Sequence, residues 1–362
     1  MILKEITLRN WRNYREATVS PSLGLNLIVG QNGAGKTNLA EAIYYLSLGR
    51  AWRGLSHEEL IRQNAESAHL VATIEESGLP RKIEINLTKK GRSIFVNGKG
   101  VHRLSDLSKV SNVIAFSPEN VRIFSGPPAE RRSFLDLAIA KEDPGHLTDL
   151  NAFLKILQER NAVLKDEFRN DGYLSVLTSE LIAIERPISE RRKRYLERLL
   201  AAFKECASSI FGEGREVSIL FHPFLESDGY EEKAKALYAE SLAADIARGS
   251  TSKGAHKEDF TVMLDGKDVG AYGSQGENRI LSLALHLTPF FLVEDEGKKP
   301  IVVLDDVYSE LDDNHAQNLT ALLQRMGQVF VTATKTNLEN ASVIEVQNDK
   351  ATIRREQYGR KE

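Results

Sequence analysis

The segment "GQNGAGKTN", residues 30–38, is the feature that most constrains how this chain can fold. It follows the apolar run "LNLIV" and precedes a segment whose apolar residues recur at helical spacing, with Gly49 as a stop signal. A strand, a glycine-rich loop and a helix in this order form a P-loop, whose backbone N–H groups face phosphate oxygens. The sequence therefore predicts a nucleoside triphosphate site, and a purely structural glycine turn is the alternative.

Each type of residue in this loop has its own role. The glycines allow a tight turn, Lys36 adds a positive charge for the phosphates, and Thr37 offers a hydroxyl to Mg²⁺. We therefore expect Mg²⁺ at this loop, with Thr37 as one of its ligands. The predicted nucleotide-binding residues of the loop are Gly30, Gln31, Asn32, Gly33, Ala34, Gly35, Lys36, Thr37 and Asn38.

A second, acidic element lies in "PIVVLDDV". Its apolar residues predict a buried strand that carries Asp305 and Asp306 to its carboxyl end, where ligands bind in open α/β sheets. Asp305 would join Thr37 as a metal ligand, and Asp306 would polarise the attacking water. Such a run by itself fits an ordinary strand end equally well. With a complete P-loop in the chain, Lys36, Asp305 and Asp306 become the predicted catalytic residues.

A third element is "GSQGENRILSLALHL", residues 273–287. Ser274, Gln275, Gly276 and Glu277 precede apolar residues at helical spacing, so they form a helix start that can accept an anion. A capped core helix is the alternative interpretation of this segment.

The pattern of apolar residues changes twice along the chain. Residues 1–120 contain short strand-like runs, with a hairpin turn at Asn97-Gly98, and strand-like runs return after residue 211. Between them, residues 121–210 repeat with helical spacing, which predicts an antiparallel helical hairpin whose second helix is kinked at Pro187. We therefore expect an α/β head built from residues 1–120 and 211–362 with an inserted helical arm. The two apolar stripes of the arm are Leu150, Leu154, Leu157 and Leu164, and Leu177, Leu181, Ile184 and Ile188.

Composition excludes several classes of protein. The 48 Lys and Arg residues are balanced by 51 Asp and Glu, so any nucleic-acid binding must come from local patches. The single cysteine, Cys206, excludes an intramolecular disulfide framework and any multi-cysteine metal site. No apolar run reaches the roughly 18 to 20 residues of a membrane span, and the N-terminus lacks a signal peptide's apolar core. We expect a cytoplasmic protein.

The order of these motifs resembles that of the ABC-type ATPases, because "SQGE" stands just ahead of "VVLDDVYSELD" and follows a P-loop. In that family two heads pair head to tail. The resemblance implies that Ser274 and Gly276 of one subunit meet the γ-phosphate held by Lys36 of the other. It also implies a loop that crosses the dimer interface, called the D-loop, formed by Ser309, Glu310, Leu311 and Asp312.

A larger ordered set of motifs resembles the bacterial RecF recombination-mediator family over nearly the whole chain. The set is "ITLRNWRNY", "GQNGAGKTN", "FSPENVRIFSGPPAERRSFLD", "LQERN", "GAHKEDF", "SQGENR" and "LDDVYSELD". The resemblance implies an ABC-type P-loop ATPase head of mixed sheets with flanking helices and an inserted helical arm. It further implies ATP as the nucleotide, an ATP-dependent homodimer, slow DNA-stimulated hydrolysis, binding to double-stranded DNA near gaps, and RecA loading with RecR and RecO.

Some positions depart from the ABC-type pattern. The resemblance places Arg12 and Asn13 at the nucleotide, although a surface turn is an alternative for them. No glutamine marks the Q-loop, where "SPEN" offers Glu119 instead, and no histidine follows "VFVTAT", so Thr334 takes the switch position. Asp306 stands where many ABC-type ATPases carry glutamate, and its shorter reach is compatible with slow hydrolysis.

Local basic residues are the candidates for DNA contacts, and each of them also fits an ordinary solvated surface. Phosphate contacts of this kind carry no base code and weaken with salt, so we expect duplex binding without sequence preference. The candidates are Lys89, Lys90, Arg92, Arg122, Arg131 and Arg132.

Three other functions compete with this interpretation. A transporter nucleotide-binding subunit would lack the inserted hairpin, and a P-loop GTPase would need an Asn-Lys-x-Asp motif that "TATKTN" does not supply. The main alternative is a nucleotide-gated structural clamp with negligible catalysis. Asp306 separates this clamp from the enzyme, because a clamp has no need for a carboxylate that activates water.

Overall fold

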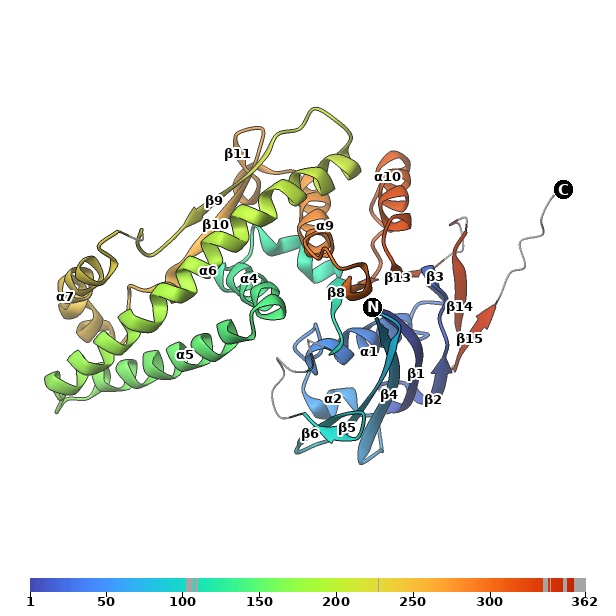
Figure 1. The fold of residues 1–362 in the computed structure, drawn as a ribbon, viewed down its shortest axis with the longest axis horizontal. Helices are drawn as coiled ribbons and strands as arrows, with labels where there is room; N and C mark the ends of the chain where they lie inside the picture. Colours follow the sequence, from blue (N-terminus) through green and yellow to red (C-terminus); the bar gives the residue numbers. More distant parts are fainter. Residues whose placement is uncertain are drawn as a thin grey trace. The chain divides into compact units, whose positions relative to one another are not determined.

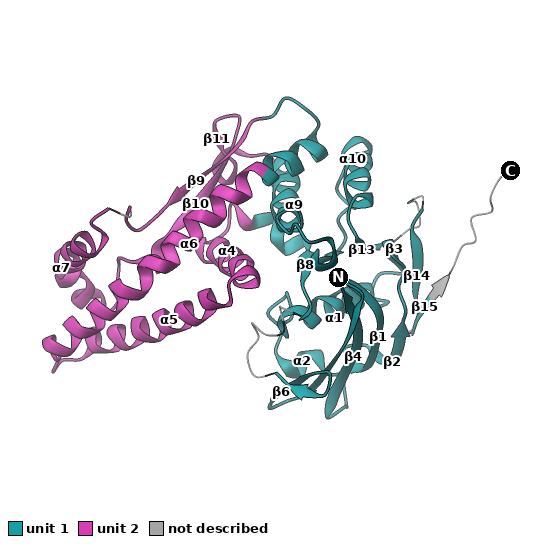
Figure 2. Cartoon of the chain, in the orientation of Figure 1, with its two compact units in different colours: residues 1–122, 202–215, 275–362 teal, residues 123–201, 216–274 magenta. Residues whose placement is uncertain are grey.

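The computed structural model describes residues 1–101, 107, 110–226, 228–334, 338, 340–347 and 350–354. The chain forms two compact units (Figure 2). Unit 1 contains residues 1–122, 202–215 and 275–362, and unit 2 contains residues 123–201 and 216–274.

Unit 1 contains an antiparallel sheet in the order β2-β1-β4-β5-β6-β7 (Figure 1). Side chains alternate between the two faces of a strand, and in β4 every second residue from Ala68 to Ile74 is buried. One face of this sheet therefore packs on the core of the unit. The strands are β1 (Ile2–Trp11), β2 (Tyr14–Val19), β4 (Ser67–Glu76), β5 (Leu79–Thr88), β6 (Gly91–Val96) and β7 (Lys99–Gly100).

The second sheet of unit 1 has the order β15-β14-β3-β13-β12-β8 and is parallel except for β15. The carboxyl ends of β3, β12 and β13 consequently meet at one edge of the sheet. This edge brings together the P-loop after β3, the acidic pair after β12 and Thr332 on β13. The strands are β3 (Gly24–Val29), β8 (Val113–Phe116), β12 (Ile301–Leu304), β13 (Gln328–Ala333), β14 (Ser342–Gln347) and β15 (Lys350–Arg354).

Helix α1 (Lys36–Leu48) lies in the core between the two sheets. Its Ile43 shares one hydrophobic cluster with Ile6 of β1 and Val303 of β12. As predicted, the helix starts at the P-loop and ends at Gly49, which has a left-handed φ of 58°. The other helices whose bounds the structure describes wholly in unit 1 are α2 (His57–Leu60), α9 (Gln275–Phe291), η3 (Glu296–Lys298) and α10 (Asp313–Gln324).

Unit 2 combines helices with a small antiparallel sheet in the order β11-β10-β9. Helix α6 begins in unit 2, and its residues from 202 onward belong to unit 1. The elements are η1 (Pro118–Ile123, which ends at the first residue of the unit), α4 (Pro128–Glu142), α5 (Pro144–Lys165), α6 (Asp171–Phe211), β9 (Val217–His222), α7 (Tyr230–Arg248), η2 (Ala255–Lys257), β10 (Asp259–Leu264), β11 (Lys267–Asp268) and α8 (Val269–Tyr272).

The predicted helical hairpin is formed by α5 and α6, with a correction to its apolar stripe. Leu154 is 48% exposed, whereas Phe153 is buried and shares a cluster with Leu181 and Ile188 of α6. The face of α5 that packs on α6 therefore follows the 3.6-residue helical period and contains Phe153 and not Leu154. Pro187 lies inside α6, which continues past it.

The boundaries of the compact units differ from the predicted domains, which assigned residues 211–274 to the head. Residues 216–274 instead group with residues 123–201. Ion pairs of buried arginines join the two segments: Arg131 with Asp259 at 2.7 Å, Arg192 with Glu258 at 2.8 Å and Arg160 with Asp245 at 3.2 Å. Periodicity reports which face of an element is apolar, but it does not show which distant charge an arginine will meet.

Membrane insertion by a helix finds no support in the part of the chain that the structure describes, because none of its helices is both long and apolar enough to span a bilayer.

Candidate functional site

The P-loop is tightly wound and its lysine is folded back over it. Gly33 and Gly35 have φ values of 80° and 110°, a left-handed region that favours glycine. The Nζ of Lys36 donates to the carbonyl oxygens of Gly30, at 2.8 Å, and Gln31, at 3.1 Å. Burial lowers the pKa of Lys36, while the nearby carboxylates of Asp306 and Asp305 oppose that shift. The loop thus presents a cation next to its row of backbone N–H groups.

The turn between β1 and β2 braces this loop from the side. Asn13 Nδ2 donates to the Ala34 carbonyl at 3.0 Å, and the Tyr14 hydroxyl donates to the Gly35 carbonyl at 2.9 Å. A Cβ at Gly35 would collide with the Asn13 carboxamide, so only glycine fits there. Asn38 Nδ2 donates to Asn13 Oδ1 at 2.8 Å and closes the brace. The structure thereby places Asn13 and Asn38 against the loop.

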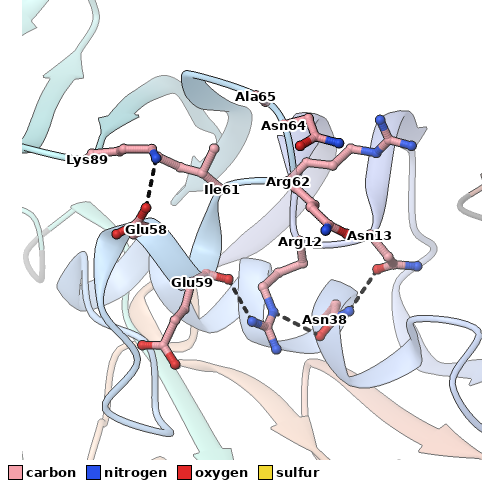
Figure 3. A pocket seen from close by; sticks show the side chains of 11 residues that line it. Arg12, Asn13, Asn38, Glu58, Glu59, Ile61, Arg62, Asn64, Ala65 and Lys89 are labelled. Carbon is pink, nitrogen blue, oxygen red and sulfur yellow. Dashed lines mark hydrogen bonds and ion pairs between the residues drawn. The ribbon is translucent and has the colours of Figure 1, made fainter.

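Arg12 lies in the same turn with a left-handed φ of 51°. Its Nη1 donates to the Glu59 carbonyl at 2.7 Å, and its Nε lies 3.4 Å from Asn38 Oδ1. Together with Asn13 and Asn38 it lines a cavity of about 540 Å³ beside the P-loop (Figure 3). The rest of the lining is Glu58, Glu59, Ile61, Arg62, Gln63, Asn64, Ala65 and Lys89.

Thr37 and Asp305, the two predicted metal ligands, contact each other directly. Thr37 Oγ1 donates to Asp305 Oδ1 at 2.9 Å, and Thr332 Oγ1 donates to the same oxygen at 2.7 Å. Asp305 is 3% exposed, and its burial raises the pKa of its carboxyl group, against the effect of the two hydroxyl donors. A buried carboxylate beside a hydroxyl is a suitable set of hard oxygen ligands for Mg²⁺.

The second oxygen of Asp305 faces a cation that the sequence did not reveal. Arg53 Nη2 lies 3.5 Å from Asp305 Oδ2, and Arg53 Nε lies 3.8 Å from Glu119 Oε1. Arg53 follows α1 in a segment without periodicity, so no sequence signal could have found it. Its position shows that a positive charge can be accommodated at the Asp305 and Glu119 carboxylates. This observation supports the fit of a divalent cation beside these two carboxylates.

Asp306 follows with a left-handed φ of 51° and an exposed side chain. Its N–H donates to Thr332 Oγ1 at 2.9 Å, and its carbonyl accepts from Arg279 Nη2 at 3.0 Å. The carboxylate of Asp306 is therefore available next to the buried Asp305. Thr332 and Arg279 are residues that the sequence reasoning missed, and only their contacts identify them.

The predicted signature residues lie at the start of α9. Ser274 is the last residue of unit 2, α9 begins at Gln275, and all three residues from Ser274 to Gly276 are exposed. Glu277 is partly buried and accepts from Arg215 Nη2 at 2.6 Å. The first three residues are accessible to another molecule, and Glu277 is held by its own chain.

The predicted D-loop lies shortly after Asp306 in the chain, with Val307 and Tyr308 between them. Ser309 Oγ donates to the Asp306 carbonyl at 3.1 Å, Glu310 pairs with Arg279, and Asp312 caps α10 by accepting from the N–H of His315 at 3.0 Å. Leu311 lines a cavity of about 750 Å³.

Thr334, the predicted switch residue, is exposed at the end of β13. It lines the same cavity of about 750 Å³ as Leu311, together with Asp306 and Thr332. The structure thus brings Thr334 into the neighbourhood of the acidic pair.

The basic candidates for DNA contacts divide into distinct environments. Lys90 is exposed in the turn between β5 and β6, Lys89 pairs with Glu58 at 2.8 Å, and Arg92 Nη1 lies 3.1 Å from His57 Nε2. Arg122 is exposed in η1.

Arg131 and Arg132 are held inside unit 2. Arg131 makes a bidentate pair with Asp259 and donates to three carbonyl oxygens. Because it is buried and its donors are used, the assignment of Arg131 to DNA is wrong, and its role is structural. Arg132 is partly buried and donates to the Glu258 carbonyl at 2.9 Å.

Known proteins resemble this chain over nearly its full length. The family model described as RecF/RecN/SMC N terminal domain matches residues 2–355. The DNA replication and repair protein RecF of Geobacillus thermodenitrificans (strain NG80-2) is 34% identical over 345 residues, covering 92% of this chain and 93% of that protein.

Solved structures give the same result. A recombination mediator protein RecF-ATP, described as part of the RecFOR pathway, has a TM-score of 0.89 and 31% identity, covering 97% of each chain. The Smc head domain of Pyrococcus furiosus, with an extended coiled coil, has a TM-score of 0.57 and 16% identity, covering 97% of this chain and 95% of that one. The second likeness concerns the fold alone. From the family model, the relatives and the ordered motifs together, the chain belongs to the RecF family of the RecF/RecN/SMC proteins.

Proposed function

We propose that this chain is a cytoplasmic, ATP-dependent DNA-binding protein of recombinational repair. Two copies pair head to tail around ATP and clamp duplex DNA near gaps, where they help load RecA with RecR and RecO, and slow hydrolysis releases the clamp. The observation that carries the proposal is the contact between Thr37 and Asp305 beside a braced P-loop. The printed names of the relatives, which refer to DNA replication and repair and to the RecFOR pathway, supply the biological setting.

ATP binding follows from the state of the loop. Lys36 donates to two neutral carbonyl oxygens. A phosphate oxygen carries a negative charge that a carbonyl oxygen lacks, so it binds the ammonium group more strongly, and Lys36 exchanges its partners when a triphosphate enters. The cavity of about 540 Å³ beside the loop has the polar lining and the position to take the nucleoside.

Hydrolysis needs a base and a held metal. Thr37 and Asp305 would hold Mg²⁺, which when bound neutralises charge on the β- and γ-phosphates. Asp306 orients the attacking water and accepts its proton, because its carboxylate is exposed beside Asp305. Lys36 stabilises the charge that develops on the transferred phosphoryl group.

Dimerisation couples the nucleotide to DNA. The exposed residues Ser274 and Gly276 can contact the γ-phosphate on a second copy, and ADP lacks that group. A ligand that makes an additional contact in the dimer binds the dimer more tightly than the monomer, so it shifts the equilibrium towards the dimer. Lys89, Lys90, Arg92, Arg122 and Arg132 are the remaining candidates for duplex phosphates, and a dimer doubles each of them.

The test is sedimentation of the full chain with Mg-ATP, with Mg-ADP or without nucleotide, each with and without a short duplex. We expect a dimer only with Mg-ATP, strengthened by the duplex, and we expect the dimer to be lost in Lys36→Met. A monomer in every condition would leave the P-loop as an ATP site but would reject the two-headed mechanism. A nucleotide-gated clamp without catalysis would give the same dimer with no phosphate released in a single-turnover assay.

A further inference from the structure

Arg279 is a buried cation whose two terminal nitrogens, Nη1 and Nη2, both bind the loop after β12. It lies in α9, shortly after the signature residues, and is 4% exposed. Its Nη2 donates to the carbonyl oxygens of Asp306, at 3.0 Å, and Val307, at 3.3 Å, and its Nη1 pairs with the Glu310 carboxylate. One guanidinium therefore holds two consecutive carbonyl groups and the D-loop.

The backbone of Asp306 is held from both sides. Its N–H donates to Thr332 Oγ1 at 2.9 Å, and Thr332 Oγ1 donates in turn to Asp305 Oδ1 at 2.7 Å. Its carbonyl is held by Arg279. The φ of 51° between these two contacts is a conformation that L-residues adopt rarely, and surrounding contacts must maintain it. The orientation of Asp306 is thus linked to that of the metal ligand Asp305.

We propose that Arg279 is a positioning residue for ATP hydrolysis, which fixes the carbonyl of Asp306 so that its carboxylate meets the attacking water. The inference rests on the proposed base role of Asp306. Arg279 touches neither nucleotide nor water in this mechanism, and it acts through the peptide of Asp306.

The chemistry of arginine suits this task. Its planar guanidinium carries several donors in a fixed geometry, so it can bind neighbouring carbonyl groups and a carboxylate together. A lysine in the same place is a point charge and cannot reproduce that fork. Burial strengthens these hydrogen bonds because the local dielectric constant is low. An aspartate base also has a shorter reach than glutamate, so a small rotation of its peptide withdraws the carboxylate from the water.

The experiment separates binding from chemistry in the full chain. Arg279→Gln and Arg279→Lys are compared with Arg186→Gln, an exposed arginine in an i,i+4 pair on α6. Dissociation constants for Mg-ATP and single-turnover hydrolysis rates are measured for each variant. We expect hydrolysis to fall by about 10-fold or more in both Arg279 variants, as small displacements of catalytic groups do, while ATP affinity stays within about 3-fold. Arg186→Gln should match the wild type.

A double mutant tests whether Arg279 acts through Asp306. Mutations of residues that act as one unit do not have additive effects on the rate. Arg279→Gln should therefore cause no further loss of hydrolysis in the Asp306→Asn background. A further loss there, an equal loss of ATP affinity, or unchanged hydrolysis would each overturn the inference. If Arg279→Gln does not fold, Arg279→Lys carries the same comparison. Undiminished hydrolysis in Asp306→Asn alone would instead reject the proposed base, and this outcome is distinct from the others.

Discussion

At the scale of single residues, the site depends on side chains that hold backbone groups. Asn13 belongs to the turn between β1 and β2, yet its carboxamide contacts the carbonyl of Ala34 and the side chain of Asn38. It also fills the space that a side chain at position 35 would need. The shape of the P-loop is therefore set partly by a residue from another sheet. This brace reduces the conformational freedom that the loop must lose when a phosphate binds.

Removal of the brace should weaken nucleotide binding. In Asn13→Ala the Ala34 carbonyl loses its donor, and a net hydrogen bond contributes about 1 kcal/mol, so we expect Mg-ATP affinity to fall by roughly 5-fold. Titration calorimetry measures the change. Asn151→Ala, on the exposed face of α5, is the matched control and should bind as the wild type does. Equal affinities in the two variants would mean that the loop holds its shape without Asn13.

At the scale of elements, the motif "GAHKEDF" is explained by packing within unit 2. Glu185 of α6 is fully buried and accepts from the Tyr238 hydroxyl of α7 at 3.0 Å and from the Ala255 N–H at 3.2 Å. Gly254 has a φ of 122°, and a Cβ there would collide with Tyr238. The motif thus joins α6 to α7. Burial raises the pKa of Glu185 to about 7.

This raised pKa predicts a pH-dependent contribution to stability. The folded state keeps a proton on Glu185 that the unfolded state releases above about pH 4.5, so the contribution is complete below that pH and is lost as the pH rises through about 7. Glu185→Gln mimics the protonated form. It should therefore gain stability relative to the wild type over this window, by roughly 3 kcal/mol in total.

Urea unfolding of both proteins between pH 4.5 and 8 gives this difference directly. His256, whose pKa burial lowers to about 4, acts in the opposite direction, and its effect cancels in the comparison. Glu180→Gln, exposed on the same helix, is the control and should show no such trend. A difference between Glu185→Gln and the wild type that stays constant with pH would show that Glu185 is ionised in the folded protein.

At the scale of the whole molecule, one chain carries both halves of the proposed composite site. The P-loop belongs to unit 1, and Ser274 is the last residue of unit 2. In a two-fold symmetric dimer, each copy would supply a P-loop to one site and a signature to the other, so two equivalent sites form together. The nucleotide would then contribute to assembly as well as to chemistry.

Ser274→Ala should separate these contributions. Loss of the hydroxyl should weaken the Mg-ATP-dependent dimer by about 10-fold or more, in line with one lost charge-assisted hydrogen bond, while ATP binding by the monomer stays near normal. Sedimentation over a range of protein concentrations, with nucleotide titration at the lowest one, measures both quantities. Ser179→Ala on α6 is the control. If ATP affinity fell as much as dimerisation, Ser274 would act within its own chain.

The sequence by itself determined the local elements and the central chemistry. Gly33 and Gly35 encode their own backbone torsions, and the apolar runs before the P-loop and before Asp305 encode buried strands. Both signals come from neighbouring residues, so they need no knowledge of the fold. The predicted α/β class with mixed sheets and the RecF family were confirmed for the same reason, since ordered local motifs carry them.

Only the tertiary structure decided which charged and polar side chains meet. Arg53, Arg279 and Thr332 join the site from separate segments, whereas Arg131, a candidate for DNA, is buried against Asp259. Residues 216–274 likewise join unit 2 through such pairs. A buried charge needs a partner, and packing places that partner anywhere along the chain. Periodicity and motif spacing describe neighbours in sequence, so they carry no information about such pairs.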